Sequence, residues 1–273
     1  MRKKANNFAF SLLCVTMTIL LALIPTKAAD IIDRADLITV FKKHNVSGTF
    51  ALYDPTQDQL TLVNSKRANI QMIPASTFKI ANSLIALETN IIADENEIIP
   101  FGGKPQPIKA WEKDMPIKQA FKVSNVPVYQ ELARRIGIQD YNIWLKKLGY
   151  GNHTVGDNVT MFWLKGPLKI SAVEQAQFIA KLAGSKLPLS MKTQQIVRNI
   201  AKIESSGNQT FYGKTGWTIA PDPNIGWFVG WVENKDNPNK LVSFALNIDI
   251  NSRKDVSLRE IIAREMLAKL GKY

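Results

Sequence analysis

The chain has 273 residues, of which 45% are hydrophobic and 21% charged, and its formal net charge is +12. That length and apolar content fit one large domain, or two lobes, with a full hydrophobic core. The basic residues are scattered, with no arginine-rich arm and no zinc-finger spacing. The charge therefore indicates affinity for anionic surfaces or substrates and argues against a nucleic-acid partner.

The first 28 residues are typical of a secretory signal peptide. The first seven carry three basic side chains, residues 8–24 are uncharged and apolar, and small residues follow around Ala28. Those seventeen apolar residues are at the lower limit for crossing a bilayer, so a retained anchor is the alternative to cleavage. Cleavage would lower the net charge to +8 and remove the only cysteine, Cys14, so the mature chain could form no disulfide.

The elements predicted next are a hairpin and a helix. Residues 48–54 and 59–64 alternate partly and flank the turn "PTQD", which predicts two paired strands. A helix follows, because apolar residues recur at spacings of 4, 3 and 4, at Ile80, Leu84, Leu87 and Ile91.

The remaining chain predicts more helices and a second hairpin. Helices are expected over 126–137, 139–151, 171–184 and 255–271, and paired strands over 226–233 and 240–249. Strands at both ends with helices between them indicate an α/β fold of the α+β type. We expect an antiparallel sheet flanked by helices in one domain, residues 29–273. The sheet lobe would span about 30–75 plus 200–273, with an inserted all-helical lobe at about 76–199.

Several kinds of catalytic site are missing from the sequence. The two histidines, His44 and His153, belong to no HExxH motif or Cys/His cluster, so no metal site is predicted. There is also no GxSxG elbow, no P-loop and no GxGxxG turn.

Ser76 and Lys79 form a Ser-x-x-Lys pair at the start of the predicted helix. Residues three apart share a helix face, and a helix N-terminus favours an oxyanion. A serine hydroxyl is a weak nucleophile without an adjacent base, and a lysine becomes that base only when desolvation makes its amine neutral. Such a pair occurs by chance about once in a chain of this length, and a serine cap followed by a surface lysine is the structural alternative.

Two later motifs favour the chemical interpretation. Ser124 begins a Ser-x-Val motif and Lys214 a Lys-Thr-Gly motif, 48 and then 90 residues further along. This order resembles the serine penicillin-recognising enzymes, and class D β-lactamases (oxacillinases) in particular. "YGN" at 150–152, "FWLKGPLKIS" at 162–171 and a later "SLRE" extend the resemblance over essentially all of residues 30–270. Ser-x-Val together with Tyr-Gly-Asn separates class D from class A.

The resemblance implies hydrolysis of the β-lactam ring of penicillin-type antibiotics through an acyl-enzyme on Ser76. Lys79 would react with CO2 to form a carbamate and act as the general base, with no other cofactor. Trp163 matches the tryptophan whose indole N–H holds the carbamate, although by itself it would be interpreted as a core aromatic. Ser124 and Lys214 would pass a proton towards the β-lactam nitrogen.

The resemblance also implies how the substrate is held. The backbone N–H groups of Ser76 and Trp217 would form the oxyanion hole, and Gly216 would let its strand approach the substrate. Thr215 and Arg259 would bind the carboxylate of the drug. Val126 and Leu164 match apolar positions of the family that keep bulk water from the lysine.

A different base is the first alternative. Class A enzymes use a glutamate in a Glu-x-x-x-Asn motif, which occurs here from Glu204 to Asn208, just before the Lys-Thr-Gly strand. We interpret it as a turn.

Three other functions stay open: a penicillin-binding sensor domain, a D-alanyl-D-alanine peptidase, and a basic non-catalytic protein that binds anionic envelope polymers. The last would explain the charge but not the order of the motifs. The resemblance implies a protein exported to the periplasm of a Gram-negative bacterium, which acts on β-lactams as a monomer or homodimer and confers antibiotic resistance.

Overall fold

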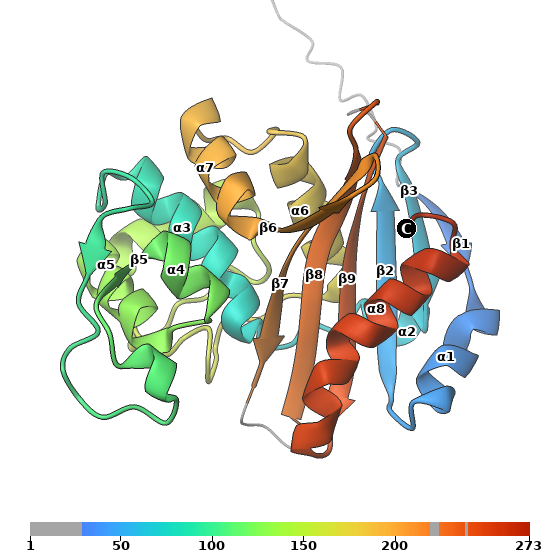
Figure 1. Ribbon diagram of the computed structural model, residues 1–273, viewed down its shortest axis with the longest axis horizontal. Helices are drawn as coiled ribbons and strands as arrows, with labels where there is room; N and C mark the ends of the chain where they lie inside the picture. Colours follow the sequence, from blue (N-terminus) through green and yellow to red (C-terminus); the bar gives the residue numbers. More distant parts are fainter. Residues whose placement is uncertain (1–28, 219–223, 238–239) are drawn as a thin grey trace, which may run out of the picture.

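The computed structural model describes residues 29–218, 224–237 and 240–273, so the predicted signal peptide lies outside the described residues. Its centre is a seven-stranded sheet with strand order β1-β3-β2-β9-β8-β7-β6 (Figure 1). The strands are β1 Asp30–Asp33, β2 Gly48–Asp54, β3 Gln59–Val63, β6 Lys202–Ser206, β7 Gln209–Trp217, β8 Asn224–Asn234 and β9 Leu241–Ile250. A separate two-stranded ribbon pairs β4 Ile98–Ile99 with β5 Met115–Pro116.

Both predicted hairpins are confirmed. β2 pairs antiparallel with β3, and β8 with β9, and β2 also pairs antiparallel with β9. The strands from the two ends of the chain thereby meet in one sheet, as expected. One edge differs from the expectation, because β1 runs parallel to β3.

The α-helices are α1 Ile38–Lys43, α2 Ser65–Ala68, α3 Lys79–Glu88, α4 Ile117–Lys122, α5 Val126–Leu148, α6 Ala172–Ala183, α7 Met191–Ala201 and α8 Leu258–Lys269. The predicted helical segments correspond to α3, α5, α6 and α8, whereas α1, α2, α4 and α7 were not predicted individually. Short 3-10 turns are η1 Ala35–Leu37, η2 Ala75–Phe78, η3 Lys109–Trp111 and η4 Arg253–Ser257. The two helices predicted over 126–151 form the two halves of α5, which Gly137 interrupts with a non-helical φ of 79°.

Helices cover both faces of the sheet (Figure 1). α8 and α1 lie on one face, where Phe41, Ile262 and Met266 pack with sheet residues such as Phe50 and Phe244. α6 packs on the other face against β9 and β2, although its residues fall within the range predicted for the helical lobe. α3, α4, α5 and α7 gather beside the β6–β7 end of the sheet.

α3 is the most enclosed helix near the site. Of its ten residues, all except the last are buried, the first of them Lys79. α5 and α7 pack against α3, and this packing encloses the lysine at its start.

Three further observations concern the described ranges. Over the described ranges, no helix has the length and apolar content needed to cross a membrane, and no three His, Cys, Asp or Glu side chains gather as a metal site would require. Glu204 lies in strand β6 and pairs with Arg264, and the turn is at residues 207–208, so the interpretation of the whole Glu204–Asn208 stretch as a turn was wrong.

Candidate active site

The Ser-x-x-Lys pair lies where η2 runs into α3. Ser76 is in the 3-10 turn, and Lys79, the first residue of α3, donates a hydrogen bond from Nζ to Ser76 Oγ at 3.0 Å. Ala75, directly before the serine, has a φ of 49°, a left-handed conformation that costs a non-glycine residue about 1–2 kcal/mol. The fold thus holds the serine on a strained turn against its lysine.

Lys79 is buried without a counter-charge. Its side chain is 0% exposed, and across the described residues no carboxylate forms an ion pair with it. Burial, and then the positive charge of Lys214, lower the pKa of Lys79 well below its ordinary value of 10.5. Nζ also lies 5.0 Å from the centre of the Tyr129 ring. A neutral amine beside Ser76 Oγ can accept its proton.

Two buried tryptophans differ in their hydrogen bonds. Trp163 and Trp227 are both 0% exposed. The Nε1 of Trp227 donates to the carbonyl of Ile73 at 2.9 Å, whereas Trp163 Nε1 has no acceptor in the part of the chain that the structure describes. The ring of Trp163 packs 5.6 Å from that of Phe78, the residue before Lys79. Leaving a buried donor unpaired costs about 1–3 kcal/mol, so this N–H is available to an acceptor from outside the polypeptide.

Ser124 and Lys214 form a second pair. Ser124 lies between α4 and α5 with a φ of 56°, and Lys214 is on β7. Lys214 Nζ donates to Ser124 Oγ at 2.9 Å and to the carbonyl of Thr215 at 2.9 Å. Burial, and then the charge of Arg259, lower the pKa of Lys214 to about 7. Because Lys214 also depresses the pKa of Lys79, the two serine–lysine pairs share one electrostatic site.

The site is bounded by a free edge of β7. β6 pairs with β7 only as far as Tyr212, while β8 pairs along the whole strand to Trp217. The N–H of Thr218 points to β8, where it donates to Ile225 at 2.9 Å. Since backbone directions alternate along a strand, the N–H of Trp217 points to the free edge instead.

That edge faces the turn carrying Ser76. A Cβ built on Gly216 would lie 2.9 Å from the carbonyl oxygen of Pro74 and 3.1 Å from Thr77 Cγ2. Only a glycine lets the strand come this close to η2. The close approach places β7 beside the turn that carries Ser76, and the oxyanion role of Ser76 and Trp217 stays a prediction.

Arg259 is held against the same strand from the opposite direction. It leaves the start of α8, donates from Nε to the carbonyl of Val256 at 2.6 Å and from Nη1 to the carbonyl of Gly216 at 2.7 Å. Within the described ranges it forms no ion pair with an acid. Its guanidinium therefore remains a cation beside the Lys-Thr-Gly strand, next to Thr215. A carboxylate ligand could accept charge-assisted hydrogen bonds from this guanidinium, on which the nearby charge of Glu260 also acts.

The two predicted apolar neighbours are less defined. Val126 is the first residue of α5 and half-buried, and half-buried Leu164 packs against the main core beside Trp163. Their predicted role in keeping water from Lys79 stays a prediction.

A cavity of about 280 Å³ lies next to the site. Lys214, Thr215, Gly213 and Phe121 are among its lining residues. A larger cavity of about 580 Å³, between α6, α7 and β8, is lined by none of the predicted site residues. The chemistry, and not the size of the cavity, identifies the functional region.

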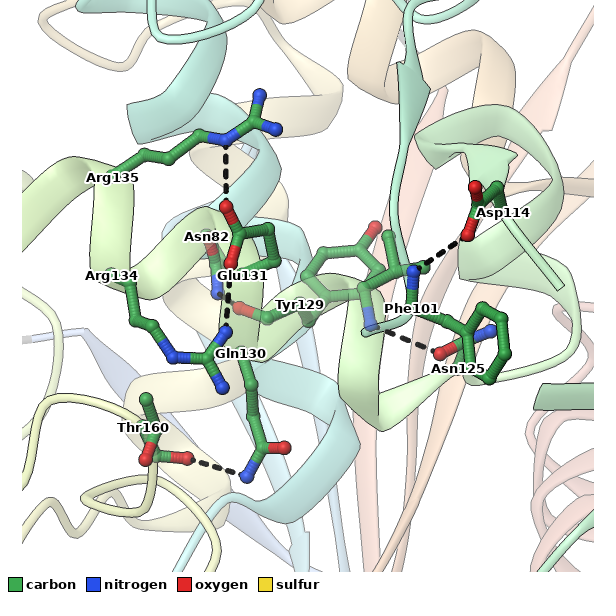
Figure 2. Close-up of polar contacts among 11 residues, drawn as sticks. Asn82, Phe101, Asp114, Asn125, Tyr129, Gln130, Glu131, Arg134, Arg135 and Thr160 are labelled. Carbon is green, nitrogen blue, oxygen red and sulfur yellow. Dashed lines mark hydrogen bonds and ion pairs between the residues drawn. The ribbon is translucent and has the colours of Figure 1, made fainter. Parts of the chain in front are cut away.

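Sequence analysis singled out neither of two buried asparagines near the site. Asn125 is fully buried and caps α5, because its Oδ1 accepts from Val128 N at 3.1 Å (Figure 2). Asn82, one turn after Lys79 on α3, reaches the carbonyl of Tyr129 on α5 (Figure 2). An asparagine before a helix is a capping signal, which could have identified Asn125, whereas the contact between α3 and α5 has no local signature.

Comparisons with known proteins agree with the geometry. Residues 48–268 match the family described as penicillin binding protein transpeptidase domain. The chain is 40% identical to beta-lactamase OXA-48 of Klebsiella pneumoniae, over 83% of this chain and 84% of that one. It is 37% identical to beta-lactamase OXA-5 of Pseudomonas aeruginosa, over 85% and 86% of the two chains.

Solved structures show the same fold. The class D beta-lactamase FUS-1 (OXA-85) of Fusobacterium nucleatum superposes with a TM-score of 0.83 at 39% identity, covering 87% of this chain and 98% of that one. The class D beta-lactamase YbXI of Nostoc gives a TM-score of 0.83 at 38% identity, covering 87% and 99%. With the two serine–lysine pairs in one site, these likenesses show that the chain belongs to the class D β-lactamase family.

Proposed function

We propose that this protein hydrolyses the β-lactam ring through an acyl-enzyme on Ser76. The observation that carries the proposal is Lys79 Nζ, buried, without a carboxylate partner in the described chain and 3.0 Å from Ser76 Oγ. Burial lowers the pKa of this amine and so favours its neutral form next to the hydroxyl, which is what activation of a serine nucleophile needs. The named activity of the relatives at 37–40% identity supports the choice of substrate.

In acylation, Ser76 Oγ forms a bond to the ring carbonyl carbon and gives its proton to the base at Lys79. The N–H groups of Ser76 and Trp217 stabilise the oxyanion, and collapse of the tetrahedral intermediate breaks the carbon–nitrogen bond. Ser124 donates its proton to the leaving nitrogen and is reprotonated by Lys214, 2.9 Å away. The base at Lys79 then gives its proton to solvent and Lys214 regains one. In deacylation the same base takes a proton from the attacking water and passes it to Ser76 Oγ as the ester bond breaks, which releases the opened product.

Arg259 and Thr215 hold the carboxylate of the drug in this scheme. The supporting feature is a guanidinium fixed on the carbonyl of Gly216, directly beside Thr215. Positioning the carboxylate there would direct the ring carbonyl to the gap between η2 and β7. Val126 and Leu164 would limit entry of water to the base.

We propose further that Lys79 is carboxylated by CO2. The residues fit this group: the neutral amine can attack CO2, and Trp163 Nε1 is a buried donor without an acceptor among the described residues. The carbamate would supply an anionic base for the proton of Ser76, held by Trp163. 13C NMR with labelled bicarbonate tests this directly, since a carbamate signal that disappears in Lys79→Ala supports it. Active enzyme without that signal would contradict it.

Steady hydrolysis of a chromogenic cephalosporin tests the function. Turnover in wild type that is lost in folded Ser76→Ala supports the proposal. A single burst followed by arrest would indicate a sensor domain, and release of D-alanine from a D-alanyl-D-alanine peptide without β-lactam turnover would indicate a peptidase. If the protein reacts with neither the cephalosporin nor the peptide, a non-catalytic binding protein would be favoured.

The protein would act outside the cytoplasm, in the periplasm of a Gram-negative host, and confer antibiotic resistance there. This proposal rests on the sequence of residues 1–28. N-terminal sequencing of periplasmic protein tests it, because the predicted result is a mature chain that begins near Ala29. Light scattering would decide between monomer and homodimer.

A further inference from the structure

A braced loop leaves the β4–β5 ribbon and returns beside Ser124. Its two ends are joined, because Phe101 N donates to Asp114 Oδ1 at 3.0 Å (Figure 2). Near its far end, Glu112 accepts from Gln106 N at 3.1 Å and pairs with Lys109. These bonds make residues 101–114 a structured unit, although the segment carries only the short turn η3.

Trp111 of this loop bonds to the residues on both sides of Ser124. Its indole Nε1 donates to the carbonyl of Val123 at 3.0 Å. Its own carbonyl accepts from Asn125 Nδ2 at 3.2 Å. Trp111 thus forms one hydrogen bond with the residue before Ser124 and one with the residue after it.

Ser124 needs such support. Its φ of 56° is a left-handed conformation that a non-glycine residue keeps only when its surroundings determine it. Backbone bonds from Ser124 N to Phe121 and from Asn125 N to Ala120 fix one side of the turn, at 3.2 Å and 2.8 Å. Trp111 supplies the restraint from the opposite element, the loop.

We infer that Trp111 is a positioning residue, which holds Ser124 so that Oγ meets Lys214 Nζ. The inference rests on the proton-transfer role proposed for Ser124. Trp111 bonds to the backbone carbonyl of Val123 and to the side-chain amide of Asn125, and Ser124 Oγ between them lies 2.9 Å from Lys214 Nζ. Loss of the indole N–H should therefore slow the step that uses this pair and leave binding of substrate almost unchanged.

Trp111→Phe removes the N–H and keeps an aromatic ring. We expect kcat to fall about fivefold with KM almost constant, which corresponds to ~1 kcal/mol for one hydrogen bond. Trp144→Phe is the matched control, because half-buried Trp144 lies on α5 with its ring under Lys147 Nζ, 4.4 Å away. It should keep wild-type kcat. All rates are measured well below the melting temperature of each variant.

A double-mutant cycle separates positioning from general structural damage. In a Ser124→Ala background, Trp111→Phe should have no further effect on kcat, because the group that it positions is gone. Equal fivefold losses in both backgrounds, or no loss in wild type, would overturn the inference. If Ser124→Ala alone leaves kcat unchanged, the proposed role of Ser124 is wrong. Because Trp111 is intact in that variant, this outcome is distinct from a failure of the inference about Trp111.

Discussion

Replacing Lys214 with methionine should abolish activity and stabilise the protein at neutral pH. The side chain is 5% exposed, and burial, followed by the charge of Arg259, lowers its pKa from 10.5 to about 7. The unfolded chain binds this proton more tightly than the folded one does. The resulting destabilisation is therefore complete below about pH 7 and disappears as the pH rises towards 10.5.

The magnitude follows from the size of that shift. One pKa unit corresponds to about 1.36 kcal/mol, so the buried lysine costs about 4 kcal/mol at pH 7 and about 1 kcal/mol at pH 10. Methionine also loses the hydrogen bonds to Ser124 and Thr215, worth about 1 kcal/mol each. Lys214→Met should thus be about 2 kcal/mol more stable than wild type at pH 7 and about 1 kcal/mol less stable at pH 10.

Urea unfolding of both proteins at pH 7 and pH 10 measures this change. Lys181→Met, at an exposed lysine on α6, is the control and should show the same difference from wild type at both pH values. A stability difference between Lys214→Met and wild type that does not change with pH would contradict a lowered pKa for Lys214. It would mean that Lys214 remains charged in the folded protein.

Three other changes test separate parts of the site. Arg259→Ala should lower kcat/KM on a β-lactam with a free carboxylate by about 1.5–3 kcal/mol, one to two decades, and an equal loss on its ester would contradict the carboxylate role. Gly216→Ala places a Cβ 2.9 Å from Pro74 O, so it should destabilise the protein by about 1–3 kcal/mol, seen as a lower melting temperature, and also lower kcat. A wild-type melting temperature and kcat would show that β7 does not approach η2 tightly. Trp163→Phe should make turnover depend more strongly on added bicarbonate, and identical bicarbonate titrations in the two proteins would remove Trp163 from the proposed carbamate site.

Much of the fold follows from local patterns. Alternating strands around short polar turns predicted both hairpins, and Gly137 and Gly149 predicted where the two halves of α5 end. The parallel edge strand β1 was not predicted, because pairing of Asp30–Asp33 with β3 depends on partners distant in sequence. The strand at Glu204 was missed for the same reason, since its pairing with Phe211 decides it.

The motifs located the site, but tertiary contacts give its electrostatics. The spacing of Ser76 and Lys79 predicts that they meet, whereas the burial of Lys79 depends on helices packed around α3. The resemblance singled out Trp163, but the hydrogen bonding of the two indoles could not be predicted, because whether an acceptor lies next to each depends on tertiary packing. Trp111 carried no signal at all, because it lies outside any periodic segment and acts through backbone groups.

The central claim is that Ser76 carries the acyl group during turnover. Rapid acid quenching of the enzyme with penicillin, followed by peptide mapping with mass spectrometry, measures this most directly. The expected result is an adduct with the mass of intact penicillin on the peptide that contains Ser76, which forms before product and decays as product is released. Product formation without an adduct, or an adduct on another residue, would contradict it.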